Sequence, residues 1–244
     1  MATKIEWTDR VWQPMHGCTK VSSACAHCYA EVMARRLQGN HIKSYEEGFK
    51  PTLNPAALDI PFRWKKPSMV FVCSMGDLFH KDVPFEYIAK VMDVISRNPL
   101  HTFQILTKRA ERMAKFFRDV PVPANAWIGV TCESFNYYDR IDWLRSIDAP
   151  VRFLSCEPLM GYLYDINLEG IHWVITGGES GNCARYIPSD CFRDLRDRCI
   201  EANVPFFFKQ WGAFGEDGRK RSKKDNGCLL DGKEWKQMPL ILNN

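Results

Sequence analysis

Three cysteines near the amino terminus are the residues whose type and spacing point most directly to chemistry. Cys18, Cys25 and Cys28 lie within residues 16–31 at a spacing of C-x6-C-x2-C, and the next cysteine is Cys73. A structural zinc site is normally closed by four protein ligands. Three thiolates on one loop instead suit a [4Fe–4S] cluster with one iron left open to another ligand. The spacing therefore predicts an iron–sulfur centre with these three cysteines as metal ligands.

Two other interpretations of the cysteine loop remain open. The three thiols could hold zinc with His16 or His27 as the fourth ligand, because Cys3His is a common zinc set. They could also be inert core thiols, although the loop is polar and contains Gly17. Among the later cysteines, five lie in apolar or helical surroundings and are predicted to be buried core side chains: Cys73, Cys132, Cys156, Cys191 and Cys199.

Short β-rich segments alternate with helical stretches through the middle of the chain. The predicted strands are Met69–Ser74, Thr102–Thr107, Trp127–Thr131, Arg152–Cys156, Trp173–Thr176 and Pro205–Lys209. The predicted helices are Tyr29–Gln38, Phe85–Arg97, Arg109–Asp119, Tyr137–Ser146 and Ser189–Ala202, the last with Ser189 as its N-cap. This alternation predicts an α/β fold with a parallel sheet curved into an open barrel. The amino-terminal segment is expected to supply or cover a further edge.

Polar residues or glycines follow each predicted strand. In a parallel barrel the carboxyl ends of the strands converge on one face, so these residues predict a shared, charged pocket. Turns and helix caps alone would explain any single one of them, but not the whole series. The candidate residues are Ser74, Gly76, Asp77, Lys108, Arg109, Thr131, Glu133, Glu157, Gly177, Gly178 and Glu179, with Lys209, Gln210 and Trp211 after the last strand.

Composition and length favour a globular protein of one domain. The chain has 244 residues, of which 45% are hydrophobic and 25% charged, and its formal net charge is +4. We predict a single domain over residues 1–244, with an irregular excursion at 38–67 and a basic, mobile segment at 212–232. The opening residues are polar, and no run reaches the ~20 apolar residues of a membrane helix. A cytoplasmic protein without a membrane partner is therefore expected.

The cysteine loop followed by βα units resembles the radical S-adenosylmethionine superfamily, whose core is an open (β/α)6 partial barrel. The usual superfamily loop is C-x3-C-x2-C, whereas the first interval here is six residues. The resemblance implies a [4Fe–4S] cluster and S-adenosylmethionine as cofactors, with the methionyl amine and carboxylate on the open iron. It also implies an electron donor that reduces the cluster.

A closer resemblance covers nearly the whole chain. Ile5-Glu-Trp-Thr-Asp9, Gly17-Cys-Thr-Lys-Val-Ser22, Ser74-Met-Gly-Asp-Leu-Phe79 and Gly177-Gly-Glu-Ser-Gly181 are similar to a family of phage- and prophage-encoded three-cysteine-motif proteins of unknown function. Membership would place the protein in the cytoplasm of a bacterial host. It supports the fold and the cluster more than any particular substrate.

Residue roles follow from the superfamily resemblance. The backbone of Ser74, Met75, Gly76 and Asp77 would meet the methionyl amine, and Lys108 or Arg109 would hold the carboxylate. Thr131 and Glu133 are placed to accept hydrogen bonds from the ribose hydroxyls. Gly177 and Gly178 would allow the backbone to approach the adenine ring closely. Glu157 and Glu179 complete the set of strand-end residues around the cofactor.

Two classes of function compete. The first is an enzyme that generates a 5′-deoxyadenosyl radical and acts on a nucleobase or nucleic acid, for example by lesion repair of the spore photoproduct lyase type. The basic and aromatic carboxyl region favours this substrate, with Lys209, Trp211, Arg219 to Lys224 and Trp235. The second is a zinc-stabilised nucleic-acid-binding protein without catalysis. It shares the thiols and the basic segment but leaves the charged strand ends unexplained.

Overall fold

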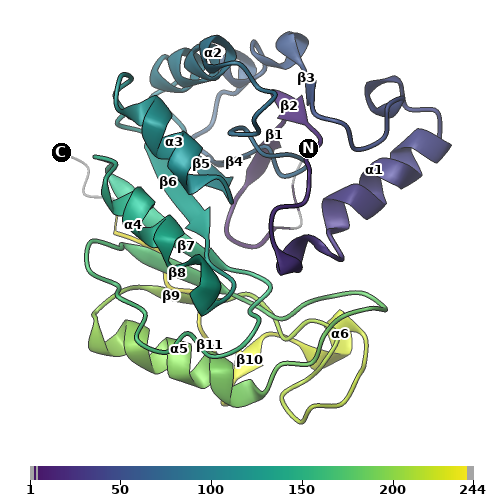
Figure 1. The fold of residues 1–244 in the computed structure, drawn as a ribbon, viewed down its shortest axis with the longest axis vertical. Helices are drawn as coiled ribbons and strands as arrows, with labels where there is room; N and C mark the ends of the chain where they lie inside the picture. The colour runs from purple at the N-terminus through teal and green to yellow at the C-terminus, as the bar shows by residue number, and fades with distance from the viewer. Residues whose placement is uncertain (1–2, 4, 241–244) are drawn as a thin grey trace. The chain divides into compact units, whose positions relative to one another are not determined.

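The computed structural model describes residues 3 and 5–240 (Figure 1). The remaining residues of the predicted 1–244 domain, namely 1, 2, 4 and 241–244, lie outside the described part. The chain divides into two compact units, Met1–Gly129 with Ser146–Pro150 and Val130–Arg145 with Val151–Asn244. The single domain over the whole chain stays a prediction.

The first unit contains the cysteine loop and the first part of the main sheet. Its strands are β1 (Arg10–Trp12), β2 (Met15–His16), β3 (Thr52–Leu53), β4 (Met69–Val72) and β5 (Thr102–Thr107). Its helices are α1 (Tyr29–Gly39), α2 (Phe85–Ser96) and α3 (Ala110–Phe117). Single 3₁₀ turns are η1 (Ser23–Cys25), η2 (Lys43–Tyr45), η3 (Pro55–Ala57) and η4 (Pro61–Arg63). β4 pairs in parallel with both β1 and β5, whereas β2 and β3 are antiparallel.

The second unit contains the remaining strands, and β6 (Ala126–Thr131) runs from the first unit into it. Its strands are β7 (Val151–Cys156), β8 (Trp173–Thr176), β9 (Phe206–Phe208), β10 (Leu229–Leu230) and β11 (Lys233–Glu234). Its helices are the 3₁₀ turn η5 (Phe135–Tyr137), α4 (Asp139–Arg145), α5 (Ser189–Glu201) and α6 (Lys223–Asn226). β8 pairs in parallel with β7 and β9, and β10 and β11 form an antiparallel pair.

The order of strands in the main sheet confirms the predicted fold class. The order is β1-β4-β5-β6-β7-β8-β9, and it never reverses direction. Doubly wound sheets reverse their order at a switch point, whereas winding in one direction with right-handed crossovers is typical of parallel barrels. The protein therefore has an α/β fold with a parallel partial barrel. All six predicted strands are present, and β1 supplies the further edge expected from the amino-terminal segment.

Apolar periodicity explains why the predicted elements form. In α2 the side chains of Tyr87, Ile88, Val91, Met92 and Ile95 are buried, which is the spacing of one helical face. All six residues of β6 are buried, as expected for a strand in the interior of a parallel sheet. The core of each unit is thus built from patterns that are local in the sequence.

One predicted N-cap and one predicted helix start were wrong. Pro188 is the N-cap residue of α5, and Ser189 is the first helical residue, with its hydroxyl accepting a hydrogen bond from Arg193 at 2.8 Å. α3 begins at Ala110, because Arg109 has non-helical backbone angles and turns its side chain toward the cysteine loop. The predicted helix 137–146 is divided into η5 and α4, and the Tyr138 hydroxyl donates to the Tyr164 carbonyl at 2.6 Å.

The two segments predicted to be irregular contain short elements. The excursion at 38–67 holds η2, β3, η3 and η4. The segment at 212–232 holds α6 and β10, and the Ser222 hydroxyl caps α6 by accepting from the Asp225 amide. The mobility of the second segment stays a prediction. In the described part of the chain, no helix combines the length and apolar character that crossing a membrane requires.

A buried histidine predicts how stability responds to acid. His101 is 2% exposed and lies edge-on against Trp64 and Phe103, and its Nδ1 has no hydrogen-bond partner among the described residues. Burial and the Arg10 charge lower the pKa of His101 below 6.5. The folded chain therefore keeps this ring neutral at pH values where the unfolded chain binds a proton. Its contribution to stability is present above pH 6.5 and is lost as the pH falls toward the lowered pKa.

We expect His101→Phe to reduce this acid sensitivity. Urea unfolding at pH 7.5 and pH 5.5 measures the difference in the free energy of unfolding between the two conditions. One such group contributes at most about 1.4 kcal/mol per pH unit. The phenylalanine variant should lose less stability on acidification than the wild type, although other buried histidines keep part of the slope. Equal losses in the two proteins would show that His101 is protonated in the folded state.

Candidate functional site

The cysteine loop is attached to the chain that follows β4. The Gly17 amide donates to the Met75 carbonyl at 2.8 Å, and Gly17 forms a parallel bridge with Gly76. A Cβ atom at Gly76 would lie 2.7 Å from Met15 Sδ and 3.0 Å from the Gly17 carbonyl oxygen. Glycine at position 76 therefore permits the close approach of the loop to the strand end. This is a structural role for a residue that was predicted to contact the cofactor.

The three thiols of the loop are half-buried and not in disulfides. Burial and the Asp77 carboxylate raise the pKa of Cys18 to about 11, although Arg109 acts in the opposite direction. Burial has the same effect on Cys25, but hydrogen bonds from Ser22 and Val21 and the charge of Lys108 outweigh it and lower the pKa of Cys25. Cys25 is therefore the readier of these two thiols to ionise and bind a metal.

The chemical types of the donors fit an iron–sulfur cluster, because three thiols share one loop. The positive charges of Arg109 and Lys108 favour the thiolate forms of Cys18 and Cys25, respectively. Within residues 3 and 5–240, however, no three His, Cys, Asp or Glu side chains are grouped so that they could hold one metal ion. His16, one of the alternative zinc ligands, is 5% exposed and its ring packs against Tyr45. His27, the other, lines an open cavity of about 460 Å³ together with Cys28.

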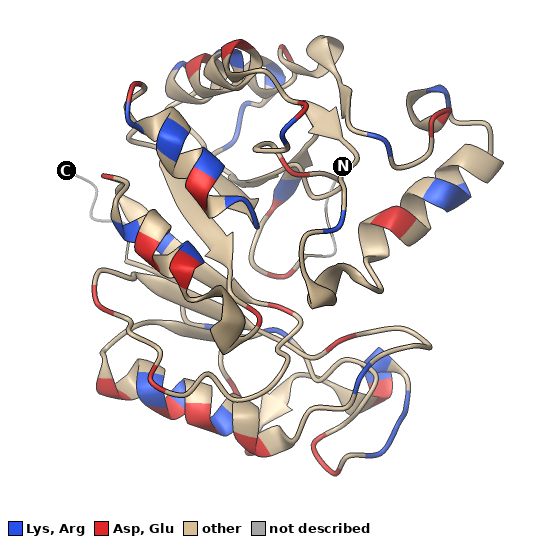
Figure 2. Cartoon of the chain, viewed as in Figure 1, with Lys and Arg blue, Asp and Glu red and all other residues tan. Residues whose placement is uncertain are grey.

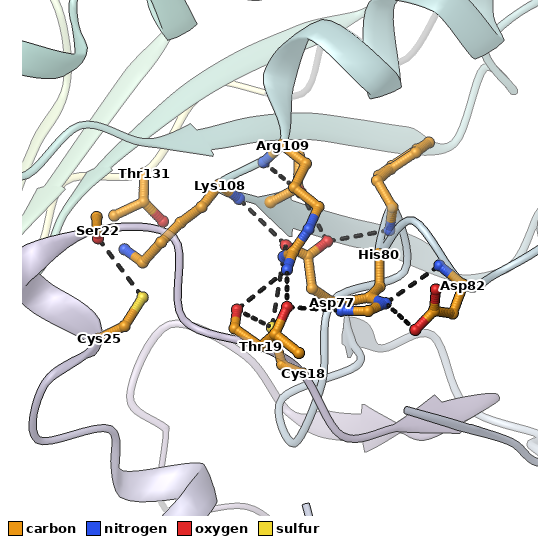
Figure 3. A network of polar contacts seen from close by, with 12 residues as sticks. Cys18, Thr19, Ser22, Cys25, Asp77, His80, Asp82, Lys108, Arg109 and Thr131 are labelled. Carbon is orange, nitrogen blue, oxygen red and sulfur yellow. Dashed lines mark hydrogen bonds and ion pairs between the residues drawn. The ribbon is translucent and has the colours of Figure 1, made fainter. Parts of the chain in front are cut away.

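The ends of β4 and β5 meet the loop in a network around Asp77 and Arg109 (Figure 3). Asp77 accepts hydrogen bonds from the Thr107 hydroxyl at 2.6 Å, the Phe79 amide at 3.0 Å and Arg109 NH1 at 2.7 Å. Arg109 NH1 also donates to Cys18 Sγ at 3.4 Å. The structure therefore brings together Cys18, Asp77 and Arg109, which the sequence predicted as parts of one site.

The remaining predicted residues of the first unit lie in the same region. The Ser74 hydroxyl accepts from Gln13 Nε2 at 2.6 Å, and the Ser74 carbonyl accepts from the Tyr29 hydroxyl at 2.5 Å. The latter bond links the start of α1, directly after Cys28, to the end of β4. The Lys108 amide donates to Asp77 Oδ2 at 3.4 Å, and the Lys108 charge acts on Cys25. Lys108 therefore lies near enough to the cysteine loop for its charge to act on Cys25, and its contact with the methionyl carboxylate stays a prediction.

In the second unit, Glu133 forms a buried ion pair that the sequence did not predict. Glu133 is 0% exposed, and Arg140 NH1 donates to its Oε2 at 3.0 Å and to the Thr131 carbonyl at 2.8 Å. The Arg140 guanidinium also lies 3.9 Å from the centre of the Tyr137 ring. Glu133 was predicted to accept from a ribose hydroxyl, and it would have to leave this pair to do so.

Two further strand-end carboxylates are paired with basic side chains. Glu157 Oε1 lies 3.1 Å from Lys209 Nζ, and both side chains are partly accessible. Glu179 receives Arg185 in a bidentate arrangement, with NH2 2.6 Å from Oε1 and Nε 2.8 Å from Oε2. Each predicted carboxylate is therefore present at its strand end, but with a cation of the protein beside it.

The two glycines after β8 allow close approaches within the protein. A Cβ atom at Gly178 would lie 1.9 Å from the Trp211 carbonyl oxygen. At Gly177 it would lie 2.9 Å from Glu157 Oε1 and 3.3 Å from the Gln210 carbonyl oxygen. The neighbour that requires glycine at position 178 is thus the Trp211 backbone. The contact of both glycines with adenine stays a prediction.

We expect Gly178→Ala to destabilise the protein. The added methyl group overlaps a backbone atom, so the chain after β9 must move, and overpacking of this kind costs about 1–3 kcal/mol. The free energy of unfolding in urea measures the loss. Gly39→Ala is the matched control, because nothing lies within 4 Å of a Cβ atom there and alanine favours a helix. A Gly178→Ala variant as stable as Gly39→Ala would contradict the packing argument.

Four partners of the predicted site residues, two in each unit, were not predicted from the sequence pattern. Thr19, His80, Arg140 and Arg185 were not proposed as site residues. Arg185 follows Glu179 by six residues and Arg140 follows Glu133 by seven, so an arginine shortly after each carboxylate was the available signal. His80 and Thr19 lie 61 residues apart, and no local pattern links them. The five later cysteines predicted as core thiols are all buried, which confirms that prediction.

The basic carboxyl region has both packed and exposed members. Trp211 is 4% exposed and donates to the Leu229 carbonyl, so it is a packing residue. Residues 219–224 are exposed, and Figure 2 shows basic and acidic positions close together along the loop before α6 and in α6 itself. Arg221, for example, pairs with Asp217 at 2.5 Å. Exposure leaves this segment accessible to a charged partner, although part of its charge is compensated.

Comparisons with known proteins identify a family but not a function. One solved structure, "Spore photoproduct lyase complexed with dinucleoside spore photoproduct", matches 78% of this chain with 10% sequence identity and a TM-score of 0.47. The match covers 61% of that chain, and at this TM-score it indicates nothing about what the present chain binds. No curated protein matches the chain. The model of the family described as "Protein of unknown function (DUF5131)" matches residues 2–239, and the chain therefore belongs to that family.

Proposed function

We propose that this protein is a radical S-adenosylmethionine-type iron–sulfur enzyme in which Cys18, Cys25 and Cys28 bind a [4Fe–4S] cluster. The observation that carries the proposal is the attachment of the three-thiol loop to the ends of two parallel strands. Arg109 makes that connection, because its NH1 donates both to Cys18 Sγ and to Asp77. When bound, the cluster and S-adenosylmethionine supply radical chemistry that begins with removal of a hydrogen atom from the substrate.

The contacts of Arg109 favour Lys108 as the residue that holds the methionyl carboxylate. Both terminal nitrogens of Arg109 already donate to Asp77, Cys18 and Thr19. Lys108 directly follows the last residue of β5, and its positive charge contributes to the lowered pKa of Cys25. An ammonium beside the cluster ligands offers the charge-assisted hydrogen bond that a carboxylate requires. The backbone of Ser74–Asp77 is the proposed partner of the methionyl amine.

The predicted ribose and adenine contacts lie in the second unit and remain proposals. Thr131 and Glu133 keep their proposed contacts with the ribose, and Gly177 and Gly178 keep theirs with adenine. Glu157 and Glu179 remain the further strand-end residues proposed around the cofactor. The side chains of Glu157 and Lys209 are partly accessible to solvent. Glu157 can therefore leave Lys209 and bind a ligand at a smaller cost in free energy than Glu133 can leave Arg140, because the second pair is buried.

A nucleobase or nucleic acid is the proposed substrate, and the exposed basic residues of 219–224 support it. A reductant must also reach the cluster. Cys28 lines the open cavity with three cations, Lys20, Arg35 and Arg36, and with one carboxylate, Glu31. Glu31 pairs with Lys20 and Arg35, so the surface beside this proposed ligand keeps a net positive charge. Such a surface suits an acidic electron donor, because complementary charge speeds encounter. Phage or prophage origin stays a prediction.

Anaerobic purification followed by metal analysis tests the proposal. We expect a brown protein with broad absorption near ~400 nm and about four iron and four sulfide per chain. Calorimetry on the reconstituted protein should then detect binding of S-adenosylmethionine. A colourless protein with one equivalent of zinc would instead support the zinc-stabilised nucleic-acid-binding alternative, for which His27 beside Cys28 is the available fourth ligand. An intact cluster with no cofactor binding at millimolar concentration would mean that the open iron serves another ligand.

A further inference from the structure

Arg109 is held from several sides at the point where the loop meets the strand ends (Figure 3). Its NH1 donates to Asp77 Oδ2 at 2.7 Å and to Cys18 Sγ at 3.4 Å. Its NH2 donates to the Thr19 carbonyl at 3.0 Å and to the Thr19 hydroxyl at 3.1 Å. The side chain is 11% exposed. The guanidinium is thus fixed by the fork geometry that distinguishes arginine from lysine.

A buried histidine, His80, contacts the Thr19 hydroxyl that Arg109 also binds. The His80 side chain is 0% exposed, and its Nε2 lies 2.8 Å from the Thr19 hydroxyl. The Asp82 amide donates to His80 Nδ1 at 3.2 Å, so Nδ1 is an acceptor. In the neutral ring the proton is then on Nε2, which donates to Thr19. The Thr19 hydroxyl oxygen therefore receives hydrogen bonds from both His80 and Arg109.

We propose that Arg109 is a positioning residue for Cys18 and donates a hydrogen bond to its sulfur when Cys18 is a cluster ligand, with His80 locking Arg109 through Thr19. The effect of Arg109 on a bound cluster rests on the proposed function, whereas its hydrogen bond to Cys18 in the metal-free protein does not. An N–H donor on a ligating thiolate withdraws negative charge from the cluster. It therefore favours the reduced form, which carries one more electron, and raises the reduction potential.

Potentiometric titration of the reconstituted protein, followed by absorption or electron paramagnetic resonance, tests the effect of Arg109 on the reduction potential of the cluster. Arg109→Gln should shift the midpoint potential to more negative values than the wild type. Arg109→Lys keeps the charge but loses the fork, so we expect a smaller shift in the same direction. Lys115→Gln is the matched control, because it removes a positive charge from the exposed face of α3, where Lys115 pairs with Glu111. An Arg109→Gln potential equal to that of the wild type would overturn the proposal.

Thr19→Val provides a second test that does not depend on the folding of Arg109→Gln. Thr19 is exposed and valine has the same shape, so the change removes only the hydroxyl that joins His80 to Arg109. We expect a negative shift smaller than that of Arg109→Gln. No shift in a folded, cluster-loaded Thr19→Val protein would remove His80 and Thr19 from the proposal.

A second measurement separates failure of this inference from failure of the proposed function. In the metal-free protein, the rate of Cys18 alkylation by iodoacetamide is compared with that of Cys25 in the same molecule by mass spectrometry. Loss of one charge-assisted hydrogen bond to sulfur should make Cys18 in Arg109→Gln about tenfold slower relative to Cys25. An unchanged ratio would overturn the role of Arg109 even if the wild type binds a cluster. A wild type without a cluster, but with the expected ratio, would overturn the proposed function alone.

Discussion

We expect Cys18→Ala, Cys25→Ala and Cys28→Ala each to abolish the cluster chromophore near ~400 nm, because a [4Fe–4S] cluster cannot be held by two thiolates. The measurement is absorption and iron content after identical anaerobic reconstitution of each variant. The loss should be complete for each of the three, which makes this the largest effect predicted for the protein.

Other cysteines provide the controls for this result. Cys183→Ala removes an exposed thiol, and Cys73→Ala or Cys199→Ala removes a buried one. All three variants should keep the chromophore, although the buried changes lower stability by leaving small cavities. A later cysteine that proves essential for the cluster would show that the ligand set is wrong. Retention of the cluster by all three loop variants would refute the iron–sulfur proposal itself.

The second large effect is expected at the buried ion pair of the second unit. Glu133→Ala leaves the Arg140 guanidinium, 6% exposed, without its carboxylate. Removing one partner of a buried pair costs about 3–5 kcal/mol, because the remaining charge stays desolvated and unpaired. Urea unfolding should therefore show a lower midpoint with an unchanged slope.

Two comparisons isolate the electrostatic origin of that loss. The double variant Glu133→Leu with Arg140→Met removes both charges, so it should be more stable than Glu133→Ala. Glu111→Ala breaks an exposed pair with Lys115 and should cost no more than about 1 kcal/mol. A double variant as unstable as Glu133→Ala would indicate that lost packing, and not an unpaired charge, causes the effect.

Much of the fold could be predicted because its signals are local. The apolar strands Thr102–Thr107 and Trp173–Thr176 were predicted with the boundaries that the structure has. Helical spacing of apolar residues likewise placed α2 within one residue of its observed end. These patterns need no information from distant parts of the chain, because strand and helix periodicity are properties of consecutive residues.

The candidate site could be predicted only as a set of residue types and strand ends. The sequence alone determined the three-thiol loop and the position of Asp77 and Arg109 after neighbouring parallel strands. Only the tertiary structure decided that Arg109 donates to Cys18, 91 residues away, and that Gly178 accommodates the Trp211 backbone. It also decided that Glu133 is paired with Arg140. Side-chain pairing depends on which atoms the completed fold brings within about 3 Å, and no consecutive pattern encodes that distance.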